Sequence, residues 1–159
     1  MLDIPIDPRS VAFDAVDRRL RADPVLKRII RHWASIPVQI KPPSASELPL
    51  MVIGLKPGNI GMATPNSFSA SLIITIDYMI PGLDPRDIIN LYGVIETAID
   101  PFGNGAWLRD PIVATGRATL HGQPMITQQG YSYQPIPEYN AIGGSAAFSI
   151  PMKINPTRC

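Results

Sequence analysis

Residues 67–80 constrain the fold of this chain more than any other segment, because apolar side chains occupy every second position. The apolar positions are Phe68, Ala70, Leu72, Ile74, Ile76, Tyr78 and Ile80. The polar side chains Ser67, Ser69, Ser71, Thr75 and Asp77 occupy the other parity. A period of two is that of a β-strand with one face in a core and one face in water. The segment is about twice the usual length of a strand, so it predicts a long half-buried strand.

The same segment leads directly into a helix. Pro81 and Gly82 end the strand, and Asp84-Pro85 provides a helix start. Asp84 with Asp87 resembles a capping box and favours the helix dipole. The helix is predicted to run from Pro85 to about residue 99. Its core face is formed by Ile88, Leu91, Tyr92, Ile95, Ala98 and Ile99.

Two further Asp-Pro pairs predict helices in the first part of the chain. Asp7-Pro8 precedes an apolar stripe formed by Ala12, Phe13, Val16 and Leu20. Asp23-Pro24 precedes Leu26, Ile29, Ile30 and Trp33, which recur at helical spacing. We therefore expect helices over residues 8–33, with a kink between them and with His32 in the second helix.

Strands are predicted over the remaining apolar segments, at 36–40, 48–56, 114–122, 124–133 and 146–154. Residues 57–66 are expected to form a long loop between two strands, and long loops in compact domains are commonly contact sites. Residues 102–112 are expected to be an irregular connection. The order predicts one α+β domain, with a mostly antiparallel β-sheet and with helices packed on a face. Its parts are the helices at 8–33, the sheet and central helix at 36–133, and a C-terminal strand and tail at 134–159.

Composition narrows the class of protein. A chain of 159 residues is long enough for one domain with a real core. Only 17% of the residues are charged, below the typical quarter, which favours a surface partly covered by partners. A net charge of +1 gives no general attraction to nucleic acid or to a membrane surface.

The sequence predicts no signal peptide, no membrane span and no internal disulfide. The first residues lack the basic and apolar regions of a signal peptide, and the longest apolar runs are far too short to cross a bilayer. We therefore expect the chain to remain in a cytosol. Cys159 is the only cysteine, so an internal disulfide or a cluster of thiolate ligands is excluded.

Catalytic and metal-binding patterns are not found in the sequence. The two histidines, His32 and His121, lack the spacing of metal ligands. The glycines at 54, 58 and 61 lack the Gly-Lys-Ser/Thr end of a phosphate loop. Ser145 is not in a nucleophile elbow. The aspartates that precede prolines are explained by helix starts and turns, so no pair of acids remains for catalysis. We expect no enzyme activity, no cofactor and no metal.

A basic cluster on the N-terminal helices leaves three interpretations open. Its members are Arg18, Arg19, Arg21, Lys27, Arg28 and Arg31, interleaved with aspartates. The cluster is either a solvated helical face, a contact for an acidic protein, or a nucleic-acid contact. Trp107, between glycine-rich residues, is either a local anchor or an interface residue.

The order of elements resembles the tail terminator, or tail-completion, proteins of long-tailed bacteriophages. The features that carry the resemblance are LRADPVL at residues 20–26, LPLMV at 48–52, the long alternating strand, LDPRDII at 83–89, and the late strands. The resemblance covers most of the chain as a pattern of elements. It leaves open that the chain is instead a neck connector or a tail-tube protein. From other classes, a small enzyme or a nucleic-acid-binding module with an unrecognised site stays open too.

The resemblance implies a structural role in a virion, assembled in the host cytoplasm. Such proteins form a ring, usually a hexamer, on the last ring of the tail tube, where they stop tube growth. Their partners are other copies of themselves, the tail tube protein, a head-completion or connector protein and, in contractile tails, the sheath. The resemblance implies no covalent chemistry, no membrane and no specific nucleic acid. The proline-rich segment 134–159 departs from the smallest members and is expected to reach another partner.

Three sets of candidate contact residues follow. Contacts with a neighbouring subunit or partner are expected from Lys56, Asn59, Ile60, Met62, Asn66, Trp107 and Arg109. The polar face of the long strand, Ser69, Ser71, Thr75 and Asp77, either faces bulk water or lines the channel of a ring. A basic partner face is expected from Arg18, Arg19 and Arg28.

Overall fold

The computed structural model describes residues 4–34, 45–64, 67–99, 106–119 and 127–155. The helices are α1 (Pro8–Ala22), α2 (Pro24–Ile29), α3 (Pro85–Ile99) and α4 (Ala106–Val113). The strands are β1 (His32–Ala34), β2 (Leu50–Thr64), β3 (Ser67–Pro81), β4 (Ala118–Thr119), β5 (Thr127–Ile136) and β6 (Ala141–Ile154). Two short 3-10 helices span Ala45–Glu47 and Pro137–Tyr139.

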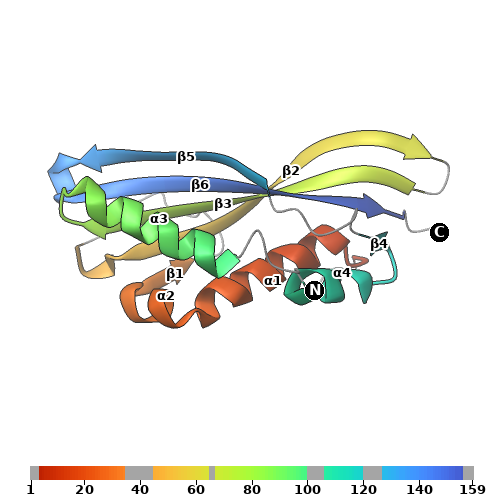
Figure 1. Ribbon diagram of the computed structural model, residues 1–159, viewed down its shortest axis with the longest axis horizontal. Coiled ribbons are helices and arrows are strands. Elements are labelled where there is room, and N and C mark those ends of the chain that lie inside the picture. Colours follow the sequence, from red (N-terminus) through yellow and green to blue (C-terminus); the bar gives the residue numbers. More distant parts are fainter. Residues whose placement is uncertain (1–3, 35–44, 65–66, 100–105, 120–126, 156–159) are drawn as a thin grey trace.

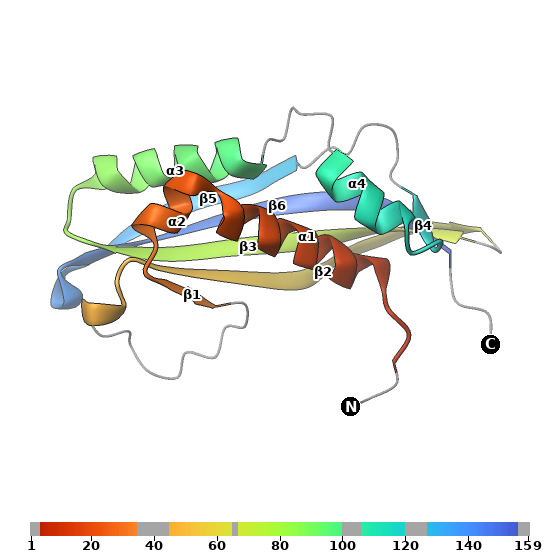
Figure 2. The same cartoon turned by 90° about the horizontal axis from the view of Figure 1, so that it is seen from below.

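The strands form a single mixed sheet in the described part of the chain. Its order is β1-β2-β3-β6-β4, and β5 pairs with another stretch of β6 (Figure 1). Strand β1 is parallel to β2, and the other pairs are antiparallel. The helices lie over one face of this sheet (Figure 2). The predicted α+β class with a mostly antiparallel sheet is confirmed.

The long strand predicted at residues 67–80 is confirmed as β3. It pairs with β2 on one side and with β6 on the other, without a register shift against β6. Its apolar parity is buried from Ala70 to Ile80, whereas Phe68 is half-buried. The length of β3 allows two long neighbours to pair with it, so the periodicity of one segment determines the centre of the sheet.

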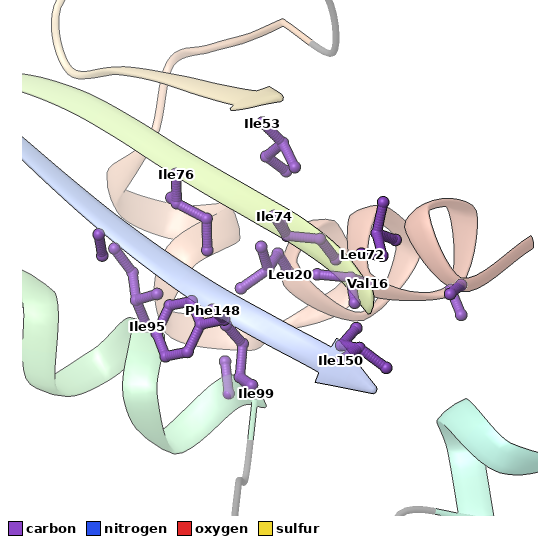
Figure 3. Packing of buried hydrophobic residues seen from close by; sticks show 14 of the residues in the cluster. Val16, Leu20, Ile53, Leu72, Ile74, Ile76, Ile95, Ile99, Phe148 and Ile150 are labelled. Atoms are coloured by element: carbon purple, nitrogen blue, oxygen red, sulfur yellow. The ribbon is translucent and has the colours of Figure 1, made fainter. Parts of the chain in front are cut away.

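The core lies between the sheet and the helical layer. Phe148 of β6, Ile76 of β3 and Leu20 of α1 are almost completely buried there, and Ile95 of α3 packs on the same side (Figure 3). Small residues on α1, such as Ala12, let that helix lie close to the other elements. Burial of these aliphatic side chains supplies the main stabilisation of the fold.

The predicted Asp-Pro helix starts are confirmed by hydrogen bonds. The Asp7 carboxylate accepts from the backbone N–H of Arg9 at 2.8 Å. Asp23 accepts from the N–H groups of Val25 and Leu26 at 3.0 and 2.9 Å. The side-chain hydrogen bond from Arg9 also lowers the pKa of Asp7. Each aspartate therefore satisfies orphan donors of the first turn.

The cap of α3 differs in detail from the predicted capping box. The Asp84 carboxylate accepts from the backbone N–H of Arg86 at 3.0 Å and binds its guanidinium group at 2.8 Å. Asp87 contributes instead through its N–H, which donates to the Asp84 carbonyl at 3.2 Å. The helix bounds Pro85–Ile99 agree with the prediction.

The predicted end of the second helix was wrong. Helix α2 ends at Ile29, and Ile30 already has an extended backbone with ψ of 123°. The Arg31 N–H then donates to the carbonyl of Pro49 at 2.9 Å, which draws the chain into the sheet beside β2. His32 and Trp33 therefore belong to β1 and not to a helix. The apolar residues have helical spacing, but pairing with the segment around Pro49 places His32 and Trp33 in a strand.

The predicted loop at residues 57–66 was also wrong. Strand β2 continues to Thr64 and pairs with β3, with register shifts between Pro57 and Ile60 and between Ile60 and Ala63. Glycine and proline, which indicated a loop, here accompany bulges in a long strand. A Cβ at Gly58 would collide with Ser71 of β3, so close strand approach accounts for this glycine. Asn66 lies outside the described residues.

Two predictions for the last third of the chain need correction. The expected irregular connection at 102–112 contains α4, which holds Trp107 and Arg109. Much of the segment 134–159 forms β6, a central strand of the sheet, and its contact with another partner stays a prediction. Strand β6 begins at Ala141, five residues before the predicted start. The predicted strand at 36–40, His121 and Cys159 lie outside the described residues.

Candidate assembly surface

The face of the sheet opposite the helices, here called the open face, carries small and polar side chains. The four predicted channel residues, Ser69, Ser71, Thr75 and Asp77, all belong to this face because they alternate with the buried side chains of β3. Strand β6 contributes Gly143, Ser145, Ala147 and Ser149 by the same alternation. The sequence-derived set is thus brought together on one surface. Its role in a channel stays a prediction.

A hollow of about 400 Å³ lies at one end of the open face. Leu50, Val52 and Met79 supply its apolar lining, and Asp77 and Ser145 supply polar groups. Leu50 and Leu48 pack with Ala141 in a small apolar cluster separate from the main core. The hollow exists because Gly143 and its neighbours on β6 have little or no side chain. It is an apolar recess with a polar margin.

The β2–β3 hairpin holds most of the predicted contact residues. Lys56, Asn59, Ile60 and Met62 lie in strand β2. Their side chains and Asn66 lie outside the described part of the structure. The distal half of this hairpin curves away from the helical layer, as Figure 1 shows. The predicted contact segment is therefore a strand pair that projects from the domain.

The basic cluster on the helices is partly a structural feature. The Arg19 Nε donates to the carbonyl of Ala98 at 3.1 Å, near the C-terminal end of α3. Its guanidinium group also lies 5.2 Å from the ring centroid of Trp107. Arg19 thus joins α1, α3 and α4 and is committed to the fold. Trp107 is a local anchor in this arrangement, packed against the main core.

Other cations of the cluster divide between internal contacts and exposed positions. Arg21 binds Asp17 at 2.9 Å and lies 5.4 Å from the ring centroid of Trp33. Arg18 and Arg28 are exposed and make no such contacts between helices in the described part of the structure, whereas Arg19 is exposed but makes the two contacts above. Arg109 is exposed on α4, with Asp110 at 3.7 Å. The candidate partner face is therefore better represented by Arg18 and Arg28 than by Arg19.

Replacement of Arg19 by alanine is expected to lower the free energy of unfolding by about 1–2 kcal/mol, because it removes a hydrogen bond to a helix end and a cation–π contact. The matched control, Arg18→Ala on the same helix, is expected to change stability by less than about 0.5 kcal/mol. Urea denaturation followed by circular dichroism measures both. Equal effects of the two substitutions would contradict the bridging role of Arg19.

A cluster of tyrosines occupies the helix-covered side of the sheet. The rings of Tyr92 and Tyr131 have centroids 4.1 Å apart, and Tyr133 is 6.3 Å from Tyr131. Burial raises the pKa of Tyr78 well above its usual value. The Tyr78 hydroxyl is therefore protonated at neutral pH. The rings of the cluster pack between β3, β5 and α3.

The described residues bring few catalytic or metal-binding side chains together. Within those ranges there is no group of three or more His, Cys, Asp or Glu side chains that could hold a metal ion. Among the same residues, no helix is long and apolar enough to cross a membrane.

Sequence reasoning missed two exposed apolar side chains at the edges of the sheet. Tyr133 of β5 is 45% exposed and Leu55 of β2 is 49% exposed. The sequence did contain one signal for the first of them, since no charged residue occurs in β5. The position of either residue at an edge depends on the strand order, which the sequence does not show.

Comparisons with known proteins found similarity among solved structures. No protein-family model matches the chain, and no curated protein matches it. Among solved structures, the chain is similar to a chain from the virion of a native gene transfer agent particle. The similarity has a TM-score of 0.45 and 11% sequence identity, and covers 89% of this chain and 93% of that chain. At this level it carries no argument about function.

Proposed function

We propose that this chain is a structural virion protein that forms a ring at the head-proximal end of a phage tail. In that position it ends tail-tube polymerisation and joins the tail to the neck or head-completion proteins. The resemblance of its element order to tail terminator proteins supports the station in the tail. The partners are further copies of the chain, expected to number six, together with the tube and head-completion proteins.

The observation that carries the proposal is the one-sided sheet. Helices α1, α2, α3 and α4 pack on one face, and the other face displays mainly small and polar side chains across β3 and β6, together with Ile73 and Met79 of β3. A ring built from such subunits can place the helical layer outside and the open face around a central channel. Asp77 and the serines of β3 then line much of the channel, and the apolar recess around Leu50, Val52 and Met79 lies at one end of it. Heterologous contacts between unlike patches close such a ring.

The oligomeric state tests the proposal. Size-exclusion chromatography with light scattering and negative-stain microscopy are expected to show a ring of about six copies, free or on the ends of purified tail tubes. Addition of the protein to polymerising tube protein is expected to shorten the tubes, which distinguishes a terminator from a tube subunit. A monomer that neither forms rings nor binds tube ends would overturn the proposal.

A further inference from the structure

The outer edge of β5 lacks the usual protection of an edge strand. Strand β5 pairs with β6 along one side, and no strand in the described part of the chain pairs with its other side. Edge strands are commonly protected by lysine, by inward-pointing charges, by proline or by bulges. Strand β5 has no charge, and beyond its bulge near Gln128 its one such device is Pro135, close to its end. The residues between them present an edge suited to another strand.

Prolines indicate which backbone groups face outward. Proline within a strand is tolerated where its missing N–H would point away from the partner strand. Pro135 of β5 therefore marks an outward position, and Tyr133 and Tyr131 share its parity. The pairing of Pro151 with Ser71 in the β6–β3 ladder leads to the same result. Because Pro151 has no N–H, the backbone groups of odd-numbered β6 residues face β5, and those of even-numbered β6 residues face β3. Tyr133 and Tyr131 thus offer their N–H and C=O groups outward.

Strand β2 presents a complementary edge on the opposite side of the sheet. Strand β1 covers β2 only from Leu50 to Val52. Beyond that point, Pro57 pairs with Leu72 of β3 and marks the outward parity. Ile53 and Leu55 share this parity, so their backbone groups face outward. Among the described residues, no strand pairs with residues 53–57 along this edge, which is limited by β1 at one end and by Pro57 at the other.

Strand directions favour the joining of these two edges in a ring. Strands β2, β3, β6 and β5 are neighbours in this order and alternate in direction. Strand β5 therefore runs opposite to β2. Rotation about a ring axis preserves the sense of every strand along that axis, so β5 of one copy is antiparallel to β2 of the next. A pairing of two β5 strands would instead need a twofold axis, which gives a closed dimer.

We propose that β5 of one copy pairs antiparallel with β2 of the next copy, with Tyr133 opposite Leu55 and with Pro57 and Pro135 at the two ends of the paired stretch. This inference rests on the proposed ring. Leu55 has the parity of the buried Ile53, and Tyr133 has the parity of Tyr131, which contacts Tyr92 of α3. Both side chains therefore lie on the helix-covered side of the sheet. Two exposed apolar groups cover each other across the junction.

The offset required by this register suits a closed sheet. Within one copy, Tyr133 lies opposite Gly144, Gly144 opposite Tyr78, and Tyr78 opposite Met51. Leu55 lies four residues beyond Met51. An offset of four residues over four long strands corresponds to a strand tilt of roughly 35°, which lies within the usual range for barrels. The open face then forms the inner wall.

The first test removes one outward donor. Tyr133→Pro deletes an N–H that is not part of the β5–β6 ladder, so the subunit is expected to fold and to lose the ring. The matched control Tyr133→Thr keeps the N–H and is expected to retain the ring at a raised protein concentration. Light scattering measures assembly, and circular dichroism measures folding. A folded Tyr133→Pro variant that still forms the ring would overturn the edge pairing.

The second test traps the junction covalently and does not depend on the proline variant. In a Cys159→Ser background, Tyr133→Cys with Leu55→Cys places two thiols opposite each other, at a separation suited to a disulfide. Oxidation is expected to give a ladder of linked subunits on a non-reducing gel. The control pair Tyr133→Cys with Ile89→Cys, on exposed α3, is expected to give none. A ring without the ladder refutes the junction alone, whereas a monomeric wild-type protein refutes the ring as well.

Discussion

Replacement of Gly144 by alanine is expected to lower the free energy of unfolding by about 1–3 kcal/mol, because an added methyl group overpacks the core. The new Cβ would lie 2.5 Å from Cε2 and 2.7 Å from Cζ of Tyr78. Tyr78 stands directly opposite Gly144 on the neighbouring strand and is almost fully buried. Its ring cannot move away without disturbing Tyr92 and Tyr131 on the same side of the sheet.

The same substitution on a helix provides the control. Gly93 lies exposed in α3, and a Cβ there meets nothing within 4 Å. Gly93→Ala is expected to raise stability by about 0.5–1 kcal/mol, because alanine favours the helix. Urea denaturation is therefore expected to show a lower free energy of unfolding for Gly144→Ala and a higher one for Gly93→Ala. A stabilising effect of Gly144→Ala would show that the Tyr78 ring is not fixed by its surroundings.

Replacement of Phe148 by alanine is expected to cost about 3–5 kcal/mol, the range for a large core aromatic. Phe148 is 2% exposed and heads the set of large side chains buried between β6 and the helices. Figure 3 shows it close to Ile95 and Ile99 of α3. The surrounding residues come from both layers, so they cannot close the cavity without a shift of α3 against the sheet.

A substitution at the next residue tests whether the two faces of the sheet differ in how tightly they are packed. Ser149 follows Phe148 in β6 and belongs to the open face. Ser149→Ala is expected to change stability by less than about 0.5 kcal/mol. Thermal unfolding of the two variants compares the two faces at adjacent positions. A large loss in Ser149→Ala would mean that the open face is packed within a single subunit, against the proposed arrangement.

The elements that the sequence predicted well are those controlled by local chemistry. Strand β3 has strict alternation, and α1 and α3 combine Asp-Pro caps with an apolar stripe. These signals need no knowledge of the neighbours. By contrast, β1 looked helical because Ile29, Ile30 and Trp33 have helical spacing, and only pairing with residues near Pro49 places His32 and Trp33 in a strand. Helix α4 contains Pro111 and follows glycines, which concealed it.

The candidate surface was predictable in part for the same reason. Ser69, Ser71, Thr75 and Asp77 were placed on one face because alternation within a strand is local. Arg19 was assigned to a partner face because its contacts with Ala98 and Trp107 come from distant segments. Leu55 and Tyr133 were not identified at all. Their exposure depends on which strands end the sheet, and that order is decided by long-range pairing.

The central position of β6 has a consequence for synthesis of the protein. Residues 141–154 leave the ribosome after β3 and β5, yet both strands pair with them. Until β6 emerges, β3 lacks this partner along one side and β5 lacks the strand with which it pairs in the described part of the chain, so the core of the nascent chain is incomplete. Folding of the sheet must therefore wait for synthesis of β6, and such long-range pairing is intrinsically slow. Chains that stop before β6 expose the apolar side of β3 and are expected to aggregate or be degraded, so only subunits that contain β6 are expected to reach assembly.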